Sequence, residues 1–385
     1  MELKLVHEDE KLLTRRIIVK VNNKKIETPL KSFELLSSKK SSPFNLLVNF
    51  SKRNVGLVEF RLNISQRQLM KIDRDERETS KFISAIKKKL KEIGENVVLL
   101  IPIYSVEDKV SENEIDYLSS LLISLLRYGI IDILSVPILR ANTKNIEVDF
   151  YFDSFTNLFL DQVFSYNKEK IAEDILGYIP KVSHRQMSKI TSFYFKYSIT
   201  NFVVEFNSST PINYSASLEK LIKHVILMER KIGREGTLIH GLNVNRGSGN
   251  RDVDKISAKD VLAFYQGITS FSFPFKPAIQ QKEEPILRVF ESVDYGYYKI
   301  PKEGLKMLAE KEGITKVESL KDMEKSINTK RLYLEATIIK NKLIEHELFS
   351  YLNSKKEIQT HLKKLQEFSS KAKNRGATNL REFFS

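Results

Sequence analysis

Three carboxylates in this sequence could do acid-base chemistry. Glu205 lies in "VVEFNSST", at the end of an apolar run that is typical of a β-strand, and a carboxylate held there can act as a general acid or base. The alternative is that Glu205 caps the next helix or pairs with an arginine. Asp149 and Asp153 in "VDFYFDSF" are four residues apart and would share one face of a helix. The alternative for this pair is a helix cap at Asp153 and a surface charge at Asp149.

A histidine and two asparagines indicate a pocket beside Glu205. His240 in "LIHGLN" could orient a substrate, or it could be a core histidine whose ring nitrogens are satisfied by neighbours. Asn207 and Asn243 follow the strand-like runs that contain Glu205 and His240. We therefore place His240, Asn207 and Asn243 together in the predicted pocket.

Several cations could bind an anion. The segment "NVNRGSGNRD" contains Arg246 and Arg251 in a Gly/Asn-rich setting, which favours anion binding through backbone N–H groups and guanidinium groups. It lacks the Lys-Ser/Thr pair of a phosphate-binding P-loop, and the alternative is an ordinary surface loop. Further candidate contacts to a nucleic acid or another anion are Lys276 and the run Lys87, Lys88 and Lys89, for which the alternative is a solvated helix face.

The charge distribution points to a polyanion. The net charge is +14, with +6 in residues 1–56, +6 in residues 301–385 and only +2 between them. Clustered positive charge suits nucleic acid because phosphate contacts release counterions, although lysine-rich surfaces also occur for solvation or thermal stability. The absence of cysteine excludes disulfides, a thiolate nucleophile and thiolate zinc sites, so we expect no metal and no cofactor. No signal peptide or apolar 18-residue stretch is apparent, which predicts a cytoplasmic protein without membrane contact.

Apolar runs of strand length alternate with amphipathic segments of helical length from Gly56 onward. This pattern predicts an α/β fold with a parallel sheet covered by helices. A closed (β/α)8 barrel fits the number of units better than an open doubly wound sheet, for which the Gly-rich first turn is missing. We predict an N-terminal β-hairpin and lead-in over 1–55, the barrel over 56–282 and a helical region over 283–385, where Asn328 is a plausible helix cap and Gly313 a helix stop.

Chemistry in such barrels lies at the carboxyl ends of the strands. The set of polar residues predicted there contains few acidic side chains. Its members are Tyr104, Glu107, Arg140, Asn142, Ser183, His184, Glu205, Asn207, His240, Asn243, Asn245, Ser272 and Lys276.

Several stretches together resemble the tRNA-guanine transglycosylases, the queuine and archaeosine tRNA-ribosyltransferases. "RRIIVKVNNKKIETP" is similar to the opening of that family, and "TLIHGLNVNRG" followed by "ISAKDVLAFYQGITSFSFPFKP" is similar to a later strand, turn and helix. The closing helices in "NTKRLYLEATIIKNKLIEHELFSYLNSKKEIQTHLKKL" are also similar. The resemblance implies a TIM-type barrel that acts on nucleic acid.

The same resemblance implies a loss of chemistry. The family's nucleophilic aspartate follows an aromatic residue, and here Ser272 follows Phe271. The family's zinc ligands of the Cys₃His type are absent. We therefore expect a noncatalytic subunit that binds tRNA or another nucleic acid, either beside an active transglycosylase or as a homodimer.

Two alternatives remain open. One is an active transglycosylase that exchanges guanine for a 7-deazaguanine in tRNA or DNA, using Glu205 with Asp149 or Asp153. The other is an unrelated barrel enzyme that acts on a small phosphorylated substrate bound by the Arg246 and Arg251 segment.

Overall fold

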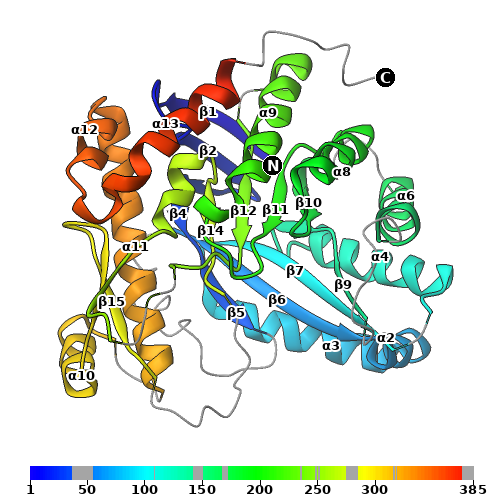
Figure 1. Cartoon of the computed structure of the whole chain (residues 1–385). Coiled ribbons are helices and arrows are strands. Elements are labelled where there is room, and N and C mark those ends of the chain that lie inside the picture. The colour runs from blue at the N-terminus through cyan, green and yellow to red at the C-terminus, as the bar shows by residue number, and fades with distance from the viewer. Residues whose placement is uncertain are drawn as a thin grey trace.

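The fold is a parallel β-barrel with an N-terminal sheet on one side and a C-terminal helical layer on another (Figure 1). We analysed a computed structural model of the 385-residue chain. The structure describes residues 1–36, 55–107, 109–141, 151–166, 172–234, 236–247, 249, 252–274, 285–314, 317 and 319–374.

The chain begins with a three-stranded antiparallel sheet in the order β1 (Glu2–Glu8), β2 (Arg15–Val21) and β3 (Lys24–Glu27). Asn22 and Asn23 form the turn between β2 and β3 with φ values of 47° and 63°. Asparagine tolerates these positive angles, which suit a two-residue hairpin turn. The predicted N-terminal hairpin is thus present.

The barrel sheet is parallel throughout. Strands β4 and β5 follow each other in the sequence with only Ser32 between them, yet they lie at opposite ends of the sheet, where β4 pairs with β14 and β5 pairs with β6. The two ends of the sheet therefore meet in a nearly closed barrel. Both lie within the stretch that the sequence assigned to the lead-in. The strands are β4 (Leu30–Lys31), β5 (Phe33–Leu36), β6 (Leu57–Ser65), β7 (Val97–Val106), β8 (Ile133–Ser135), β9 (Ile138–Ala141), β10 (Ile175–Ile179), β11 (Phe202–Glu205), β12 (Ile239–Leu242) and β14 (Ser270–Phe271).

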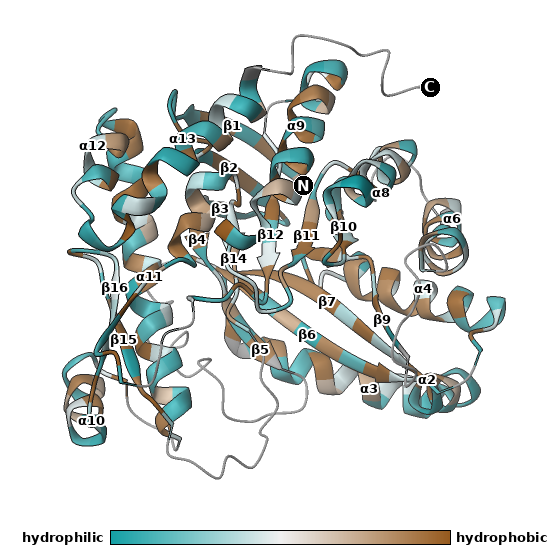
Figure 2. Cartoon of the chain, viewed as in Figure 1, coloured by the Kyte–Doolittle hydropathy of each residue, from teal (hydrophilic) through white to brown (hydrophobic). Residues whose placement is uncertain are grey.

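Helices cover the outside of this barrel, and apolar colouring is concentrated on the strands and on α4 (Figure 2). The predicted α/β class is confirmed. One expected helix differs, because residues 261–266 form a 3₁₀ segment that is buried on every side and ends at Gly267, where φ is 87°. The helices around the barrel are α2 (Gln66–Arg74), α3 (Glu76–Leu90), α4 (Glu112–Arg127), α6 (Asn157–Tyr166), α8 (His184–Lys196) and α9 (Ser215–Ile232).

The C-terminal layer joins a small antiparallel sheet to four helices. The sheet has the order β13 (Lys255–Ser257), β16 (Gly296–Lys299) and β15 (Arg288–Glu291), and the helices are α10 (Lys302–Lys311), α11 (Leu320–Ile344), α12 (Leu348–Asn353) and α13 (Gln359–Asn374).

The prediction that Asn328 caps a helix is wrong. Helix α11 begins after Ser319, whose hydroxyl accepts the Asp322 N–H at 3.0 Å. Asn328 is buried mid-helix, where its amide binds the backbone of Arg288 and Phe290 in β15. Gly313 follows the end of α10 with φ at 71°, as expected for a helix stop.

None of the helices in the described ranges has both the length and the apolar character needed to cross a bilayer.

Candidate functional site at the barrel mouth

Two charged side chains of β6 point into the barrel. Glu59 and Arg61 are two residues apart, so they share one face of the strand, and their side chains are 0% and 5% exposed. The Arg61 Nε donates to Glu59 Oε1. A buried ion pair is costly to desolvate unless its remaining polar atoms are also bonded, and both residues have such partners.

Glu59 continues into a buried chain of hydrogen bonds. Its Oε2 lies 2.6 Å from His240 Nε2, and His240 Nδ1 lies 2.9 Å from the Ser270 hydroxyl. An ionised carboxylate only accepts, so His240 carries a proton on Nε2. Both ring nitrogens are therefore engaged and the ring is fully buried, which is the arrangement of a core histidine.

Arg61 carries the network toward the carboxyl ends of the strands, which we call the barrel mouth. Its NH1 group donates to Asn243 Oδ1 at 2.9 Å, and NH2 donates to Ser272 Oγ at 3.2 Å and to the Phe273 carbonyl at 3.5 Å. The backbone N–H of Asn243 also donates to Ser272 Oγ at 3.3 Å. One guanidinium thus ties β6 to the ends of β12 and β14.

Ser272, which the sequence resemblance places opposite the transglycosylase nucleophile, is fully buried. Its hydroxyl hydrogen-bonds Glu59, the nearest base. Burial favours the protonated carboxyl, but the Arg61 charge and the His240 and Ser272 hydrogen bonds outweigh it and lower the pKa of Glu59. A carboxylate that binds protons so weakly is a poor base, so the serine is not activated.

Glu205, at the end of β11, is the half-buried carboxylate of the mouth. Its Oε1 accepts the Asn207 N–H at 2.6 Å, and the Asn243 Nδ2 donates to both carboxylate oxygens at 3.0 and 3.1 Å. No lysine or arginine of the described ranges forms an ion pair with it. Burial therefore prevails over these hydrogen bonds and raises the pKa of Glu205. A carboxyl that holds its proton more strongly than usual suits acid catalysis or hydrogen-bond donation.

The turns after β11 and β12 hold the mouth in shape. Asn207, Ser208 and Asn243 have φ values of 45°, 59° and 59°, in the left-handed region, which asparagine tolerates but which strains Ser208. The Ser208 N–H donates to the Asn243 carbonyl at 3.1 Å, and the Asn245 amide donates to the Ser208 carbonyl at 2.8 Å. These hydrogen bonds hold the strained Ser208 and the two asparagines in place at the mouth.

Two further cations border the mouth. Lys181, which follows β10, donates to Ser209 Oγ at 2.6 Å. Arg140, at the end of β9, is exposed. The rim around Glu205 is thus formed by amides, hydroxyls and cations.

The C-terminal layer reaches the same end of the barrel. Lys325 of α11 pairs with Glu34 of β5 at 2.7 Å, and Glu34 also accepts from the buried Lys31 at 2.8 Å and from the Phe273 N–H at 2.7 Å. Burial opposes ionisation of Glu34, but the charges of Lys31 and Lys325 prevail and lower its pKa to about 2. This cluster fixes α11 and the end of β14 against β5.

The structure brings together only part of the predicted site. Glu205, Asn243, Ser272 and His240 are linked through Arg61 and Glu59, and Asn207 binds Glu205. Asp149, Asn142, Arg251 and Lys276 lie outside the described residues.

The other predicted residues lie elsewhere. Asp153 lies within the π-helix formed by residues 151–156, where it lines a hollow beside α8, so it is not a helix cap. Arg246 pairs with Glu324 at 2.6 Å and stacks on Tyr297 at 5.2 Å, so its guanidinium joins the barrel to α11. Lys87 and Lys88 are exposed on α3, and Lys89 is half-buried there.

Residues that sequence reasoning missed are Glu59, Arg61, Ser270, Glu34, Lys31 and Lys325. A signal existed in "GLVEFRLN", because Glu59 and Arg61 alternate with apolar residues and therefore share a face. In a strand buried on both sides, such a charged face points into the barrel.

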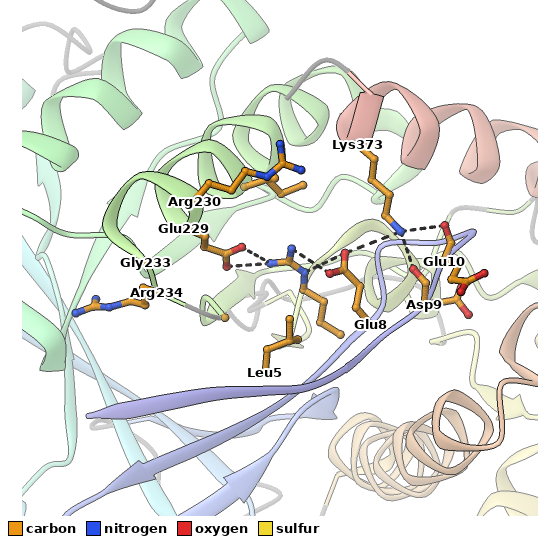
Figure 3. Close-up of a pocket in the computed structure, with 12 residues that line it drawn as sticks. Leu5, Glu8, Asp9, Glu10, Glu229, Arg230, Gly233, Arg234 and Lys373 are labelled. Carbon is orange, nitrogen blue, oxygen red and sulfur yellow. Dashed lines mark hydrogen bonds and ion pairs between the residues drawn. The ribbon is translucent and has the colours of Figure 1, made fainter. Parts of the chain in front are cut away.

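A large hollow lies away from the mouth, between β1, the end of α9 and α13 (Figure 3). It measures about 640 Å³. Its cations are engaged, since Arg15 pairs with Glu229 at 2.8 Å and Lys373 donates to the carbonyls of Asp9 and Glu10. The end of α9 leads to the amino end of β12, a side of such barrels that usually serves stability.

No protein-family model matches this chain, and no curated protein matches it. Within the described residues, no group of three or more histidine, aspartate or glutamate side chains is arranged to hold a metal ion.

Proposed function

We propose that this protein is a transglycosylase-like barrel that binds nucleic acid, most simply tRNA, as an accessory subunit and does not itself displace a base. The observation that carries the proposal is the state of Ser272. The residue at the nucleophile position is buried, donates to a carboxylate of lowered pKa and accepts from Arg61. An activated nucleophile needs exposure and an effective base, and Ser272 lacks both.

The finer fold that goes with this proposal is a (β/α)8 TIM-type barrel. Counting β4 with β5 as one strand, and β8 with β9 as another, leaves eight barrel strands in the order of the sheet. Helices or a 3₁₀ segment follow most of these strands in the described chain. The N-terminal sheet and the C-terminal layer of helices support this proposal.

The mouth has the chemistry of a binding site for a nucleobase. Glu205 accepts hydrogen bonds when ionised and donates one when protonated, and Asn207 beside it is exposed. Such groups match the ring N–H, carbonyl and amino groups of a purine or a 7-deazapurine. Arg140 and Lys181 lie on the same rim and suit phosphate groups.

The proposal is tested by measuring binding and exchange on the same protein. We expect the isolated protein to bind tRNA at about 50 mM salt, with affinity that falls steeply toward about 200 mM salt. We also expect no incorporation of labelled guanine or a 7-deazaguanine into tRNA or duplex DNA, and co-purification with an active transglycosylase. If tRNA and duplex DNA both fail to bind at the lower salt, nucleic-acid binding is wrong. If the isolated protein exchanges a base, the noncatalytic assignment is wrong.

One observation favours a second candidate, an active base-exchanging enzyme that uses Glu205. The pKa of Glu205 is raised by burial, and its carboxylate is oriented by Asn243 and Asn207. On this hypothesis exchange is detectable, Glu205→Gln abolishes it, and Ser272→Ala leaves it intact. Because glutamine keeps the shape and the accepting oxygen, loss of exchange with retained tRNA affinity would assign proton transfer to Glu205.

A further inference from the structure

Helix α8 presents only positive charge to solvent. The sequence has no acidic residue between Asp174 and Glu205. The exposed cationic side chains on α8 and just before it are Lys181, Arg185, Lys189 and Lys196, which we call the α8 face. A helix surface of this kind without interspersed acids attracts polyanions.

A hollow of about 230 Å³ adjoins this face. It lies between α8 and the π-helix of residues 151–156, and π-helices are frequent at functional sites. Phe152 and Phe193 line it, with ring centroids 5.5 Å apart and an interplanar angle of 69°. Lys189 and Lys196 also line it, so aromatic surface and positive charge occur together. The remaining polar groups in the hollow are Gln186, Asp153 and Ser192.

The α8 face is continuous with the barrel mouth. Helix α8 follows β10, so its first turn lies at the carboxyl end of that strand. Lys181, between them, already bonds Ser209 in the turn after β11. A chain that leaves the mouth beside Glu205 therefore meets Lys181 first, then Arg185, and then the hollow.

We propose that the α8 face, with its hollow, holds a single-stranded segment of nucleic acid next to the base bound in the mouth. This inference rests on the proposed function and specifies the route of the strand. The cations bind phosphates, and an unstacked base enters the hollow against the partly exposed ring of Phe193, which packs on the buried Phe152. Base stacking on aromatic side chains combined with a cationic track is the usual mode of single-strand binding. Gln186 and Asp153 offer a donor and acceptors for the edge of that base.

The test compares paired lysine substitutions that remove the same charge from two helices. Lys189→Ala with Lys196→Ala alters the α8 face, and Lys306→Ala with Lys311→Ala, two exposed lysines of α10 in the C-terminal layer, is the matched control (Figure 1). The probe is a fluorescent single strand of about 16 nucleotides, with affinity measured between about 50 mM and 200 mM salt.

We expect the α8 pair to weaken binding at least tenfold at the lower salt. It should also reduce the slope of log affinity against log salt by about 1.4, which corresponds to two lost phosphate contacts on a single strand at about 0.7 each. The α10 pair should leave the slope within about 0.3 of the wild-type value on the same scale. Phe193→Leu, which keeps apolar bulk and removes the aromatic face, should weaken binding about tenfold with an unchanged slope.

Each failure has a distinct meaning. If the wild-type protein binds the strand but the α8 and α10 pairs behave alike, the α8 route is wrong and the proposed function stands. If the α8 pair loses only the association with an active transglycosylase, the face binds protein and not nucleic acid, and the inference is overturned. If wild-type protein binds neither the strand nor tRNA at low salt, the proposed function falls and this inference with it.

Discussion

Replacing Arg61 by methionine tests whether the buried network supports the barrel as well as the mouth. The change leaves Glu59 fully buried without its ion partner and removes a donor from Asn243. Breaking a buried ion pair on one side typically costs about 3–5 kcal/mol of unfolding free energy. Because Glu59 keeps its hydrogen bond from His240, we expect the unfolding free energy to fall by about 3 kcal/mol at about pH 7.

The pH dependence follows from the direction of the pKa shifts. In the wild type the pKa of Glu59 lies below its ordinary value of 4.5, so this group stabilises the fold above about pH 4.5 and the contribution is lost as the pH falls through the lowered pKa. Without Arg61, burial raises the pKa of Glu59 above the unfolded value. Protonation then stabilises the variant, and the difference between variant and wild type shrinks from about pH 7 to about pH 4.

Urea unfolding followed by far-UV circular dichroism measures both effects. The matched control is Arg67→Met, which removes an arginine whose pair with Glu107 at 2.7 Å is exposed and is worth at most about 1 kcal/mol. The double substitution Glu59→Gln with Arg61→Met should recover most of the loss, because it leaves no buried charge. The reasoning is refuted if Arg61→Met costs no more than Arg67→Met, or if the double variant is as unstable as the single one.

Three further outcomes are expected. Tyr297→Phe removes the 2.6 Å hydrogen bond to buried Asp260, whose pKa is raised to about 6 by burial. The variant should lose about 1.5–3 kcal/mol of unfolding free energy above about pH 6, where Asp260 is ionised, and less below it. Urea midpoints at two pH values measure the difference. Lys325→Met should lower the urea midpoint at neutral pH, and the loss should disappear toward about pH 2, where Glu34 is protonated; a loss independent of pH would assign Lys325 to packing alone. Glu205→Gln should lower the unfolding free energy at about pH 7 by less than about 1 kcal/mol, or should raise it. The reason is that the raised pKa of Glu205 means that its ionisation costs stability at this pH. A large loss in calorimetric melting would contradict this.

Elements with strong periodicity were predictable from the sequence. The apolar runs that became β6, β7 and β11 and the helical patterns that became α3, α9 and α13 are recognisable because burial imposes periods of 2.0 and 3.6 residues. The 3₁₀ segment at residues 261–266 was predicted as a helix, and its burial on every side shows that tertiary packing decided its form. Asn328 had the residue type of a cap, but the side chain of Ser319 caps α11 nine residues earlier.

The candidate site was less predictable because its bonds join distant parts of the chain. Glu59 and His240 are 181 residues apart, and Arg61 and Ser272 are 211 apart. Periodicity shows which face of a strand a residue occupies, but it does not identify the partner opposite. Glu205 and Asn243 are predictable from their position at strand ends, whereas Arg61, which bonds Asn243, lies inside a strand, where position alone does not mark a site residue.

The mouth depends on the orientation of one amide. Arg61 has donors only, so the group of Asn243 that faces it must be the oxygen, and Oδ1 indeed accepts from Arg61 at 2.9 Å. The amide nitrogen is then left to donate to Glu205. A neutral amide therefore separates a buried guanidinium from the mouth carboxylate, and Glu205 gains a hydrogen bond without a direct ion pair. Because the charge of Arg61 is compensated by Glu59, burial remains the largest influence on Glu205 and its pKa stays raised. The charges of the buried pair thus oppose each other at the half-buried Glu205. A substitution at Glu59 that leaves Arg61 uncompensated should lower the pKa of Glu205, and it should alter ligand binding there without touching the ligand.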